Sequence, residues 1–232
     1  MSKDKREGDQ QDDKKKAELY DLSDKEGTDY YLREESRYAM TRFDKQGEYT
    51  LEDYNALPDD LRVELIDGVF YIMEASGFMH QDLARLFYDQ LRSFFAGKKG
   101  LCKPFFAPLN VRLDCDDRTM LQPDILILCD PTKVQKWGIN GAPDFCLEIV
   151  SPSTMRKDYF TKLQKYKDAG VKEYWILDPY KKRLLTYCWK DAYTPHVHPL
   201  KGNIPMELYD GQMMINLDSF LEAITEDLDD RE

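Results

Sequence analysis

Two acidic residues lie inside strand-like apolar runs, and a lysine follows on the next predicted helix. Asp124 stands in QPDILIL, Glu148 in FCLEIV and Lys162 in DYFTK. A carboxylate buried in a strand costs several kcal/mol unless a cation or hydrogen bonds compensate it. Two such acids therefore indicate a bound divalent metal, and the lysine indicates metal-assisted hydrolysis. Magnesium sites with few protein ligands complete their coordination with water and substrate phosphates.

The position of Lys162 on its helix supports this interpretation. Tyr159, Lys162 and Tyr166 are separated by three and four residues, which is helical spacing. Lys162 therefore lies on or beside the apolar stripe that faces the sheet. A plainer interpretation is an exposed pair with Asp158 at i,i+4, which stabilises a helix only slightly. The periodicity does not put the lysine on an exposed face, and the preceding strand supplies Glu148 as a partner.

The other acids and the first histidine leave alternatives open. Glu148 suits a strand buried on both faces, although an edge strand would leave it in water. Asp124 alone is weaker evidence for a metal site, because Pro-Asp sequences are common in turns. Glu64, in VELI, is either a third metal ligand or the outward position of an amphipathic hairpin. Asp144 is interpreted as a strand-entry residue, and His80 as a helix cap or local hydrogen bonder.

Composition restricts the class of protein. The 232 residues carry a net charge of -11 with a pI near 4.9, which counts against indiscriminate nucleic-acid binding. Five cysteines show no CxxC spacing, so we expect no zinc cluster and no disulfide framework, with Cys129 and Cys146 as small core residues. No secretory signal or membrane-spanning run is visible, and a reducing cytoplasm is the simplest location.

Periodicity and turn signals predict the elements that position these residues. A capping box at Thr50 and Asp53 begins a short helix, and Asp67-Gly68 joins two strands into a hairpin. Helices are predicted over 80–95, 153–169 and 218–224, strands over 105–113, 121–128, 143–150, 174–177 and 184–189, and loops over 131–142 and 195–199.

The order of these elements predicts the fold class. The strand, helix and strand across 145–177 form a βαβ unit with parallel strands and a right-handed crossover. The fold is therefore α/β (α+β), a central mixed sheet flanked by helices. We divide the chain into a charged N-terminal arm (1–46), a globular domain (47–225) and an acidic tail (226–232).

The motifs together resemble a known family. They are ELIDG at 64–68, PD at 123–124, EIVSPST at 148–154, Asp158, Lys162, Tyr166 and GVKEYW at 170–175. This set, spread over 49–189, resembles the bacterial Uma-type restriction endonuclease family of the PD-(D/E)xK nuclease superfamily. The resemblance implies a restriction-endonuclease-like core whose metal is held by Asp124, Glu148 and the Ile149 carbonyl. Val150 stands where the superfamily usually has its lysine, and Lys162 would replace that lysine from the helix.

The leading hypothesis is a metal-dependent endonuclease that hydrolyses DNA phosphodiesters with Mg²⁺, or with Mn²⁺ in its place. Lys162 would orient or deprotonate the attacking water, or stabilise charge in the transition state, and Glu64 would assist at the metal. Double-strand cleavage would favour a symmetric homodimer. The expected basic surface for the DNA backbone comprises Arg156, Lys157, Lys165 and Lys167.

Two other functions stay open at this point. The acidic pI, the charged arm and the lack of a separate DNA-reading domain favour a catalytically inactive binding module that keeps the nuclease core. A third hypothesis is hydrolysis of RNA or of a small phosphodiester.

Overall fold

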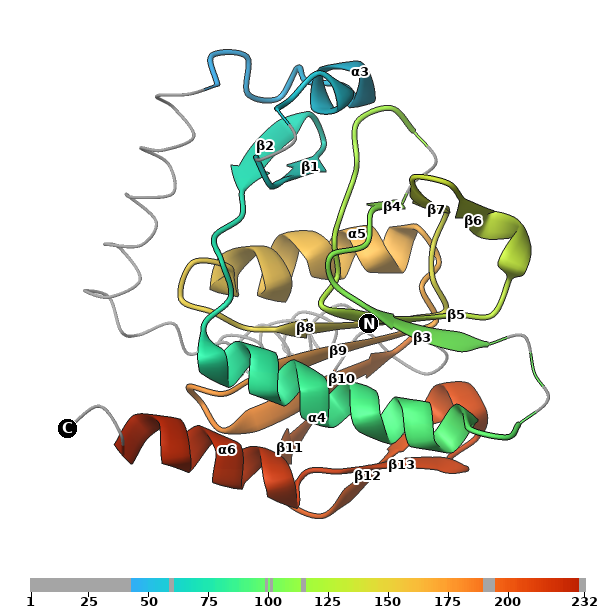
Figure 1. Cartoon of the computed structure of the whole chain (residues 1–232), viewed down its shortest axis with the longest axis vertical. Coiled ribbons are helices and arrows are strands. Elements are labelled where there is room, and N and C mark those ends of the chain that lie inside the picture. Colours follow the sequence, from blue (N-terminus) through green and yellow to red (C-terminus); the bar gives the residue numbers. More distant parts are fainter. Residues whose placement is uncertain are drawn as a thin grey trace, which may run out of the picture.

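The protein is built around one mixed six-stranded sheet (Figure 1). The computed structural model describes residues 43–58, 61–98, 100, 102–113, 116–189 and 195–229. Almost all of the predicted arm (1–46) and the end of the predicted tail lie outside these residues. The sheet strands are β3 (Lys103–Phe106), β5 (Ile125–Leu128), β8 (Phe145–Ile149), β9 (Glu173–Asp178), β10 (Arg183–Cys188) and β11 (His196–Pro199).

The strand order confirms the predicted βαβ unit and the predicted fold class. The order is β11-β10-β9-β8-β5-β3, and β8 and β9 are parallel while the other pairs are antiparallel. The two parallel strands lie at the centre of the sheet, where every residue of both is buried. This burial is typical of parallel strands covered on both faces.

Two layers of helix cover the sheet (Figure 1). Helices α4 (Phe78–Phe95) and α6 (Asp218–Asp229) lie on one face, and α5 (Leu163–Asp168) lies on the other. Strand β8 contributes to both cores because successive side chains of a strand point to opposite faces. Phe145, Leu147 and Ile149 pack with α4 and α6, whereas Cys146 and Val150 pack on the α5 face. Glu148 therefore points toward α5.

An N-terminal unit brings Glu64 to the same face. The predicted capping box at Thr50 begins α3 (Leu51–Asn55), and the predicted hairpin joins β1 (Val63–Ile66) to β2 (Val69–Ile72). Asp67 and Gly68 both adopt positive φ, as the tight hairpin requires. Leu65 pairs with Met120 across an isolated bridge, which places β1 beside the segment that leads into β5.

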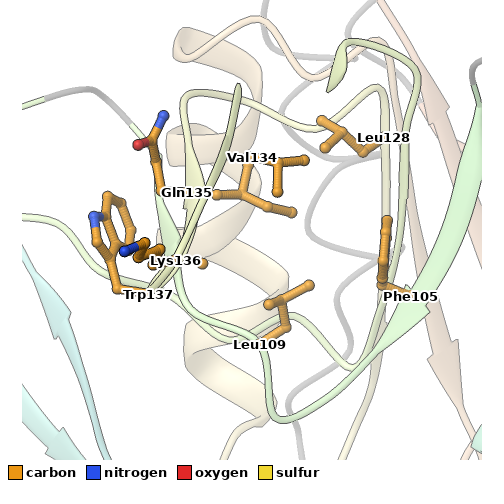
Figure 2. Close-up of a pocket in the computed structure, with 9 residues that line it drawn as sticks. Phe105, Leu109, Leu128, Val134, Gln135, Lys136 and Trp137 are labelled. Atoms are coloured by element: carbon orange, nitrogen blue, oxygen red, sulfur yellow. The ribbon is translucent and has the colours of Figure 1, made fainter. Parts of the chain in front are cut away.

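Two predictions of local structure between β3 and β8 are wrong. The strand expected over 105–113 is divided between β3 and β4 (Val111–Arg112), because Pro108 lacks the N–H that a continuous ladder needs. The loop expected over 131–142 contains η1 (Pro131–Lys133) and a hairpin of β6 (Val134–Gln135) and β7 (Gly138–Asn140). Its exposed Val134 and Trp137 line an apolar pocket with Phe105 (Figure 2).

The C-terminal part is also more regular than predicted. The expected loop over 195–199 is edge strand β11, where His198 lies 3.1 Å from Thr186 Oγ1. A further hairpin of β12 (Asn203–Met206) and β13 (Met213–Asn216) precedes α6, which runs five residues beyond the predicted end at 224. These strands are short and lack strict alternation, so the sequence carried little signal for them.

The helix predicted over 153–169 is interrupted by a π-helical segment. Residues Lys157–Lys162 form this segment, η2, and α5 follows it directly. Lys157, Asp158, Tyr159 and Lys162 are all buried in it, which is a wider buried face than an α-helical stripe provides. π turns often occur at functional sites.

The cysteine prediction is wrong at one position and confirmed at another. Cys102 and Cys129 form a disulfide, because the antiparallel pairing of Lys103 with Leu128 brings these neighbours together. Cys146 is buried and free, as expected. Disulfides are rare in reducing compartments. Among the described helices, none has the length and apolar character needed to span a bilayer.

Candidate active site

A buried lysine at the end of η2 is surrounded by carboxylates from three elements. Lys162 Nζ lies 2.9 Å from Glu64 Oε1, 3.0 Å from Glu148 Oε1 and 3.5 Å from Asp158 Oδ1. The side chains of these four residues are at most 3% exposed. The hairpin, the central strand and the π segment thus meet at a single cation.

The two glutamates are fixed by further hydrogen bonds. The Gln122 backbone N–H donates to Glu64 Oε1 at 3.1 Å, which ties β1 to the segment before β5. The Tyr166 hydroxyl, on α5, donates to Glu148 Oε1 at 2.6 Å. Lys162 and Tyr166 therefore hold the same oxygen of Glu148 and leave the other oxygen outside their contacts.

Asp124 lies beside this cluster at the start of β5. Ile125 pairs with Leu147, so one further step of the antiparallel register places Asp124 opposite Glu148. Asp124 Oδ2 accepts a hydrogen bond from the Ile149 N–H at 2.7 Å and lies 3.1 Å from His80 Nε2. His80 comes from the first turn of α4, so a strand of the sheet and a helix on one of its faces fix this carboxylate.

The electrostatics of the cluster reflect one lysine among several acids. Burial alone would lower the pKa of Lys162, but Glu148, Glu64 and Asp158 raise it well above its ordinary value. Burial raises the pKa of Glu148 well above its usual range, and Lys162 only partly opposes this effect. Burial likewise raises the pKa of Asp158 to about 6 against the effect of Lys162. The cluster keeps its lysine charged and carries more acid than that lysine neutralises.

The pKa of His80 depends on a different set of opposing effects. Burial would lower the pKa of His80, but its hydrogen bond to Asp124 and the charge of that carboxylate raise it. Its other ring nitrogen, Nδ1, is buried without a hydrogen-bond partner in the described part of the protein. The prediction of His80 as a helix cap or local hydrogen bonder is therefore wrong, because its partner is a site acid 44 positions along the chain.

Three acids of the site supply carboxylate oxygens, which are the ligand type that hard divalent cations take. Within the described residues, the contacts of Glu64, Asp124 and Glu148 all go to one oxygen of each carboxylate, leaving a second oxygen for another ligand. Among the residues that the structure describes, no group of three or more His, Cys, Asp or Glu is placed so that it could hold a metal ion. Magnesium commonly binds through one or two carboxylates and completes its shell with water and phosphate.

The structure brings together the residues singled out in the sequence. Glu64, Glu148 and Lys162 are in direct contact, and Asp124 is the neighbour of Glu148 across the sheet. The contact seen at Ile149 is its N–H on Asp124, whereas its carbonyl was the expected metal ligand. The catalytic and metal-binding roles of all five residues stay predictions.

Three residues of the site were not assigned to it from the sequence. Asp158 was considered only as the partner of Lys162 in the alternative of an exposed i,i+4 pair, and the structure buries both residues. Tyr166 shared the helical stripe of Lys162, and that spacing was the available signal for its contact with Glu148. For His80 no local signal existed, because its contact with Asp124 joins residues 44 positions apart.

The expected basic surface is only partly present. Lys157 is buried with its ammonium 4.8 Å from the centre of the Tyr71 ring, so its prediction as a surface residue is wrong. Lys165 binds Asp67 Oδ1 at 2.7 Å, which leaves less of its charge for another anion. Arg156 is exposed and Lys167 is half-buried.

Asp144 has the structural role predicted for a strand-entry residue. Its carboxylate accepts hydrogen bonds from the Cys129 N–H and from Lys172 Nζ, both at 2.7 Å. These contacts join the end of β5 to the start of β9, away from Lys162.

Comparisons with known proteins agree with this architecture. A model of the Uma2 family, described as "Putative restriction endonuclease", matches residues 51–214. Among solved structures, the chain is similar to a protein from Anabaena variabilis ATCC 29413, described as a putative nuclease belonging to DUF820. The two share 16% sequence identity with a TM-score of 0.63, over 75% of this chain and 98% of that chain. At this identity the likeness establishes the fold. No curated protein matches the chain.

Proposed function

Because the chain belongs to the Uma2 family, whose description is "Putative restriction endonuclease", we propose that it is a nuclease whose catalytic centre is the cluster around Lys162. The family and the nuclease-type neighbour support a nuclease-like function. The finer proposal is a Mg²⁺-dependent endonuclease that hydrolyses DNA phosphodiesters. The observation that carries it is one buried lysine held by three acids, with Asp124 opposite Glu148.

The second oxygens of Asp124 and Glu148, with the Ile149 carbonyl, would hold the metal, and Glu64 would assist. Bound Mg²⁺, or Mn²⁺ in its place, would supply Lewis-acid polarisation of the scissile phosphate and activation of the attacking water. The excess of acid over lysine in the cluster favours a divalent cation there. DNA cleavage on both strands would further require two such sites, as in a symmetric dimer.

The protein's own residues perform the remaining steps. The raised pKa of Lys162 keeps it protonated at neutral pH, so it donates hydrogen bonds and stabilises negative charge rather than accepting a proton. Tyr166 fixes the orientation of Glu148, and the Ile149 N–H with His80 fixes that of Asp124. Preorganised groups of this kind are effective because they need no rearrangement during the reaction.

A second candidate is a binding module that keeps the nuclease core without activity. The observation that favours it is the burial of Lys162, whose side chain is 3% exposed and already surrounded by three carboxylates. In this case metal would stabilise the fold without any cleavage of nucleic acid.

Plasmid cleavage tests the proposal directly. We expect wild-type protein to nick or linearise supercoiled DNA with Mg²⁺ or Mn²⁺, and chelation to abolish this activity. Lys162→Ala and Asp124→Asn should both be inactive, while Lys172→Ala, which removes an exposed lysine outside the cluster, should retain activity. Thermal melts with and without metal identify variants that fail to fold. Equal activity of wild type and Lys162→Ala would contradict the catalytic assignment.

A further inference from the structure

The strands that carry the candidate site end at one edge of the sheet. Strands β8 and β9 are parallel, and the Val150 N–H donates to the Leu177 carbonyl at 2.9 Å where both strands finish. Asp124 directly precedes β5, which runs antiparallel to β8, so Asp124 lies at this same edge. Ligands of open α/β sheets bind outside the carboxyl ends of the parallel strands. A segment that leaves the sheet at this edge therefore lies beside the candidate site.

The turn between β9 and β10 leaves the sheet at this edge. It comprises residues 179–182 (PYKK) and directly follows Asp178, the last residue of β9. A strand rises about 3.3 Å per residue, so the turn begins about 10 Å along β9 from Ile176, the partner of Glu148 across the sheet. Successive phosphates of one DNA strand rise about 3.4 Å along the helix axis. A DNA strand held at the site would thus pass the turn within a few phosphates.

Side-chain contacts fasten this turn to the π segment that ends at Lys162. The Tyr159 hydroxyl, on η2, donates to Asp178 Oδ2 at 2.5 Å, and Arg183 Nη2 donates to that hydroxyl at 3.1 Å. The Lys181 N–H donates to Asp178 Oδ1 at 3.0 Å. These contacts hold both ends of the turn against η2, so the turn and the lysine of the site belong to one packed unit.

The two segments that border this edge are basic, although the protein is acidic. Residues 149–157 (IVSPSTMRK) and 179–183 (PYKKR) contain five Lys or Arg and no Asp or Glu, whereas the whole chain has a net charge of -11. The acids that adjoin these segments in the sequence, Asp158 and Asp178, are both buried. Positive charge is therefore concentrated where the strands of the site end.

Three of these basic residues reach the surface around the turn. Arg156 and Lys182 are exposed and Lys181 is half-buried, and we call these three residues the basic edge. Arg156 lies three residues before Tyr159, the η2 residue that contacts the end of β9. The basic edge thus includes one residue from the start of η2 and two from the turn beside it.

The backbone at Lys182 does not require a lysine. Its φ is 47°, in the left-handed region that glycine adopts most easily and that asparagine tolerates better than most residues. The turn could therefore form with asparagine at this position, without the charge. Lys182→Asn is for this reason a substitution that removes a positive charge while it preserves the turn.

We propose that the basic edge binds the phosphate backbone of the DNA whose phosphodiester is cleaved at the cluster around Lys162. The inference rests on the proposed nuclease function. It supplies the cationic surface that Lys157 and Lys165 do not, since the first is buried and the second pairs with Asp67. Lysine and arginine bind phosphates by releasing condensed counterions, irrespective of base sequence. This contact positions the duplex and carries no base preference.

Duplex binding at several salt concentrations tests the basic edge without any requirement for cleavage. A short fluorescein-labelled DNA duplex would be titrated with wild type, Lys182→Asn and the double variant Lys181→Gln/Lys182→Asn, with anisotropy as the readout. Ca²⁺, which also takes carboxylate oxygens, would replace Mg²⁺. Each lost phosphate contact should reduce the slope of log affinity against log salt by about 0.9, and should weaken binding about five- to tenfold near 0.1 M salt.

The controls separate a phosphate contact from a loss of structure. Lys136→Asn alters an exposed lysine in the turn between β6 and β7 and should bind as wild type. Lys182→Asn should melt no lower than wild type, and its loss of affinity should be equal for duplexes of different sequence. An unchanged salt slope in the double variant, or a loss confined to one sequence, would overturn the proposal. Lysine-dependent binding of phosphatidylserine vesicles without binding of the duplex would also overturn it.

Plasmid cleavage by the same variants distinguishes this inference from the proposed function. In the double variant, the DNA concentration for half-maximal rate should rise in proportion to the loss of affinity, and by more than the saturated rate falls. A fall in the saturated rate alone would overturn the backbone assignment. If wild type binds the duplex through these lysines and cleaves nothing, the nuclease function fails and the inference stands. If wild type cleaves and the variants bind as tightly, the inference fails and the nuclease function stands.

Discussion

Two buried glutamates on adjacent strands have different kinds of partner. Glu148 on β8 and Glu173 on β9 are 3% and 1% exposed, and they lie toward opposite faces of the sheet. Glu173 accepts hydrogen bonds from the Trp175 indole at 2.7 Å, the Leu208 N–H at 2.8 Å and the Glu207 N–H at 3.3 Å. Glu148 instead shares Lys162 with other acids.

The comparison separates a structural acid from a candidate catalytic one. Burial raises the pKa of both glutamates, but neutral donors oppose it at Glu173 whereas the charged Lys162 opposes it at Glu148. The donors around Glu173 use both of its oxygens and fasten β9 to the segment after β12. At Glu148, by contrast, one oxygen makes none of the contacts with Lys162 and Tyr166. The site around it contains more carboxylates than lysines. The partners of a buried acid, rather than burial itself, therefore indicate chemistry.

Removal of Lys162, the cation beside Glu148, should produce the largest effect of the changes considered. Lys162→Met leaves three carboxylates without their cation, and we expect a loss of about 3–5 kcal/mol in the free energy of unfolding at neutral pH. Nuclease activity should fall by about 10²–10³-fold. Urea unfolding and plasmid cleavage measure the two effects. Lys172→Met, which removes an exposed lysine while Asp144 keeps its hydrogen bond from the Cys129 N–H, should cost no more than about 1 kcal/mol.

Removal of the structural glutamate should affect stability alone. Glu173→Ala leaves the buried Trp175 indole and two part-buried backbone N–H groups without an acceptor, and an unpaired buried donor costs about 1–3 kcal/mol. We expect a total loss of about 3 kcal/mol and a changed Trp175 emission. The Mg²⁺-induced rise in melting temperature should equal that of wild type. A reduced metal response would show that the two glutamates are not independent.

A smaller change tests how Glu148 is held. Tyr166→Phe deletes the 2.6 Å hydrogen bond to Glu148 and should cost about 1–2 kcal/mol of stability. It should also weaken Mg²⁺ binding in calorimetry, because Glu148 loses a group that orients it. Tyr159→Phe is the matched control, since its hydroxyl donates to Asp178 at 2.5 Å instead. Equal metal affinity in the two variants would restrict Tyr166 to a structural role.

The smallest expected effect is the contribution of Glu173 to the pH dependence of the free energy of unfolding. Burial raises its pKa above 4.5 in the folded state, so the folded protein retains a proton that the unfolded chain has released. This contribution is present below pH 4.5 and is lost as pH rises through the folded pKa. Relative to wild type, Glu173→Gln should therefore become more stable as pH rises across this window. Urea unfolding of both proteins at matched pH values measures the difference, and a constant difference would contradict it.

Much of the central architecture could be predicted from the sequence, because its signals are local. The Asp67-Gly68 turn, the Thr50 cap and the buried runs around Asp124 and Glu148 each depend on near neighbours along the chain. The disulfide and the contact of His80 with Asp124 depend on which strands and helices meet, so no short window contained them. Glu173 also stood in a recognised motif, but its partners come from a hairpin that was not predicted.

The π segment has a consequence for how relatives are aligned with this chain. A π turn holds one residue more than an α turn, so Lys157–Lys162 behaves as a single-residue insertion within an otherwise α-helical stretch. A homologue that lacked this insertion would present a different residue to Glu148 from the position equivalent to Tyr166. Alignment by helical spacing alone would then shift by one beyond Phe160, and evolutionary loss of the extra residue would turn both Lys162 and Tyr166 away from Glu148.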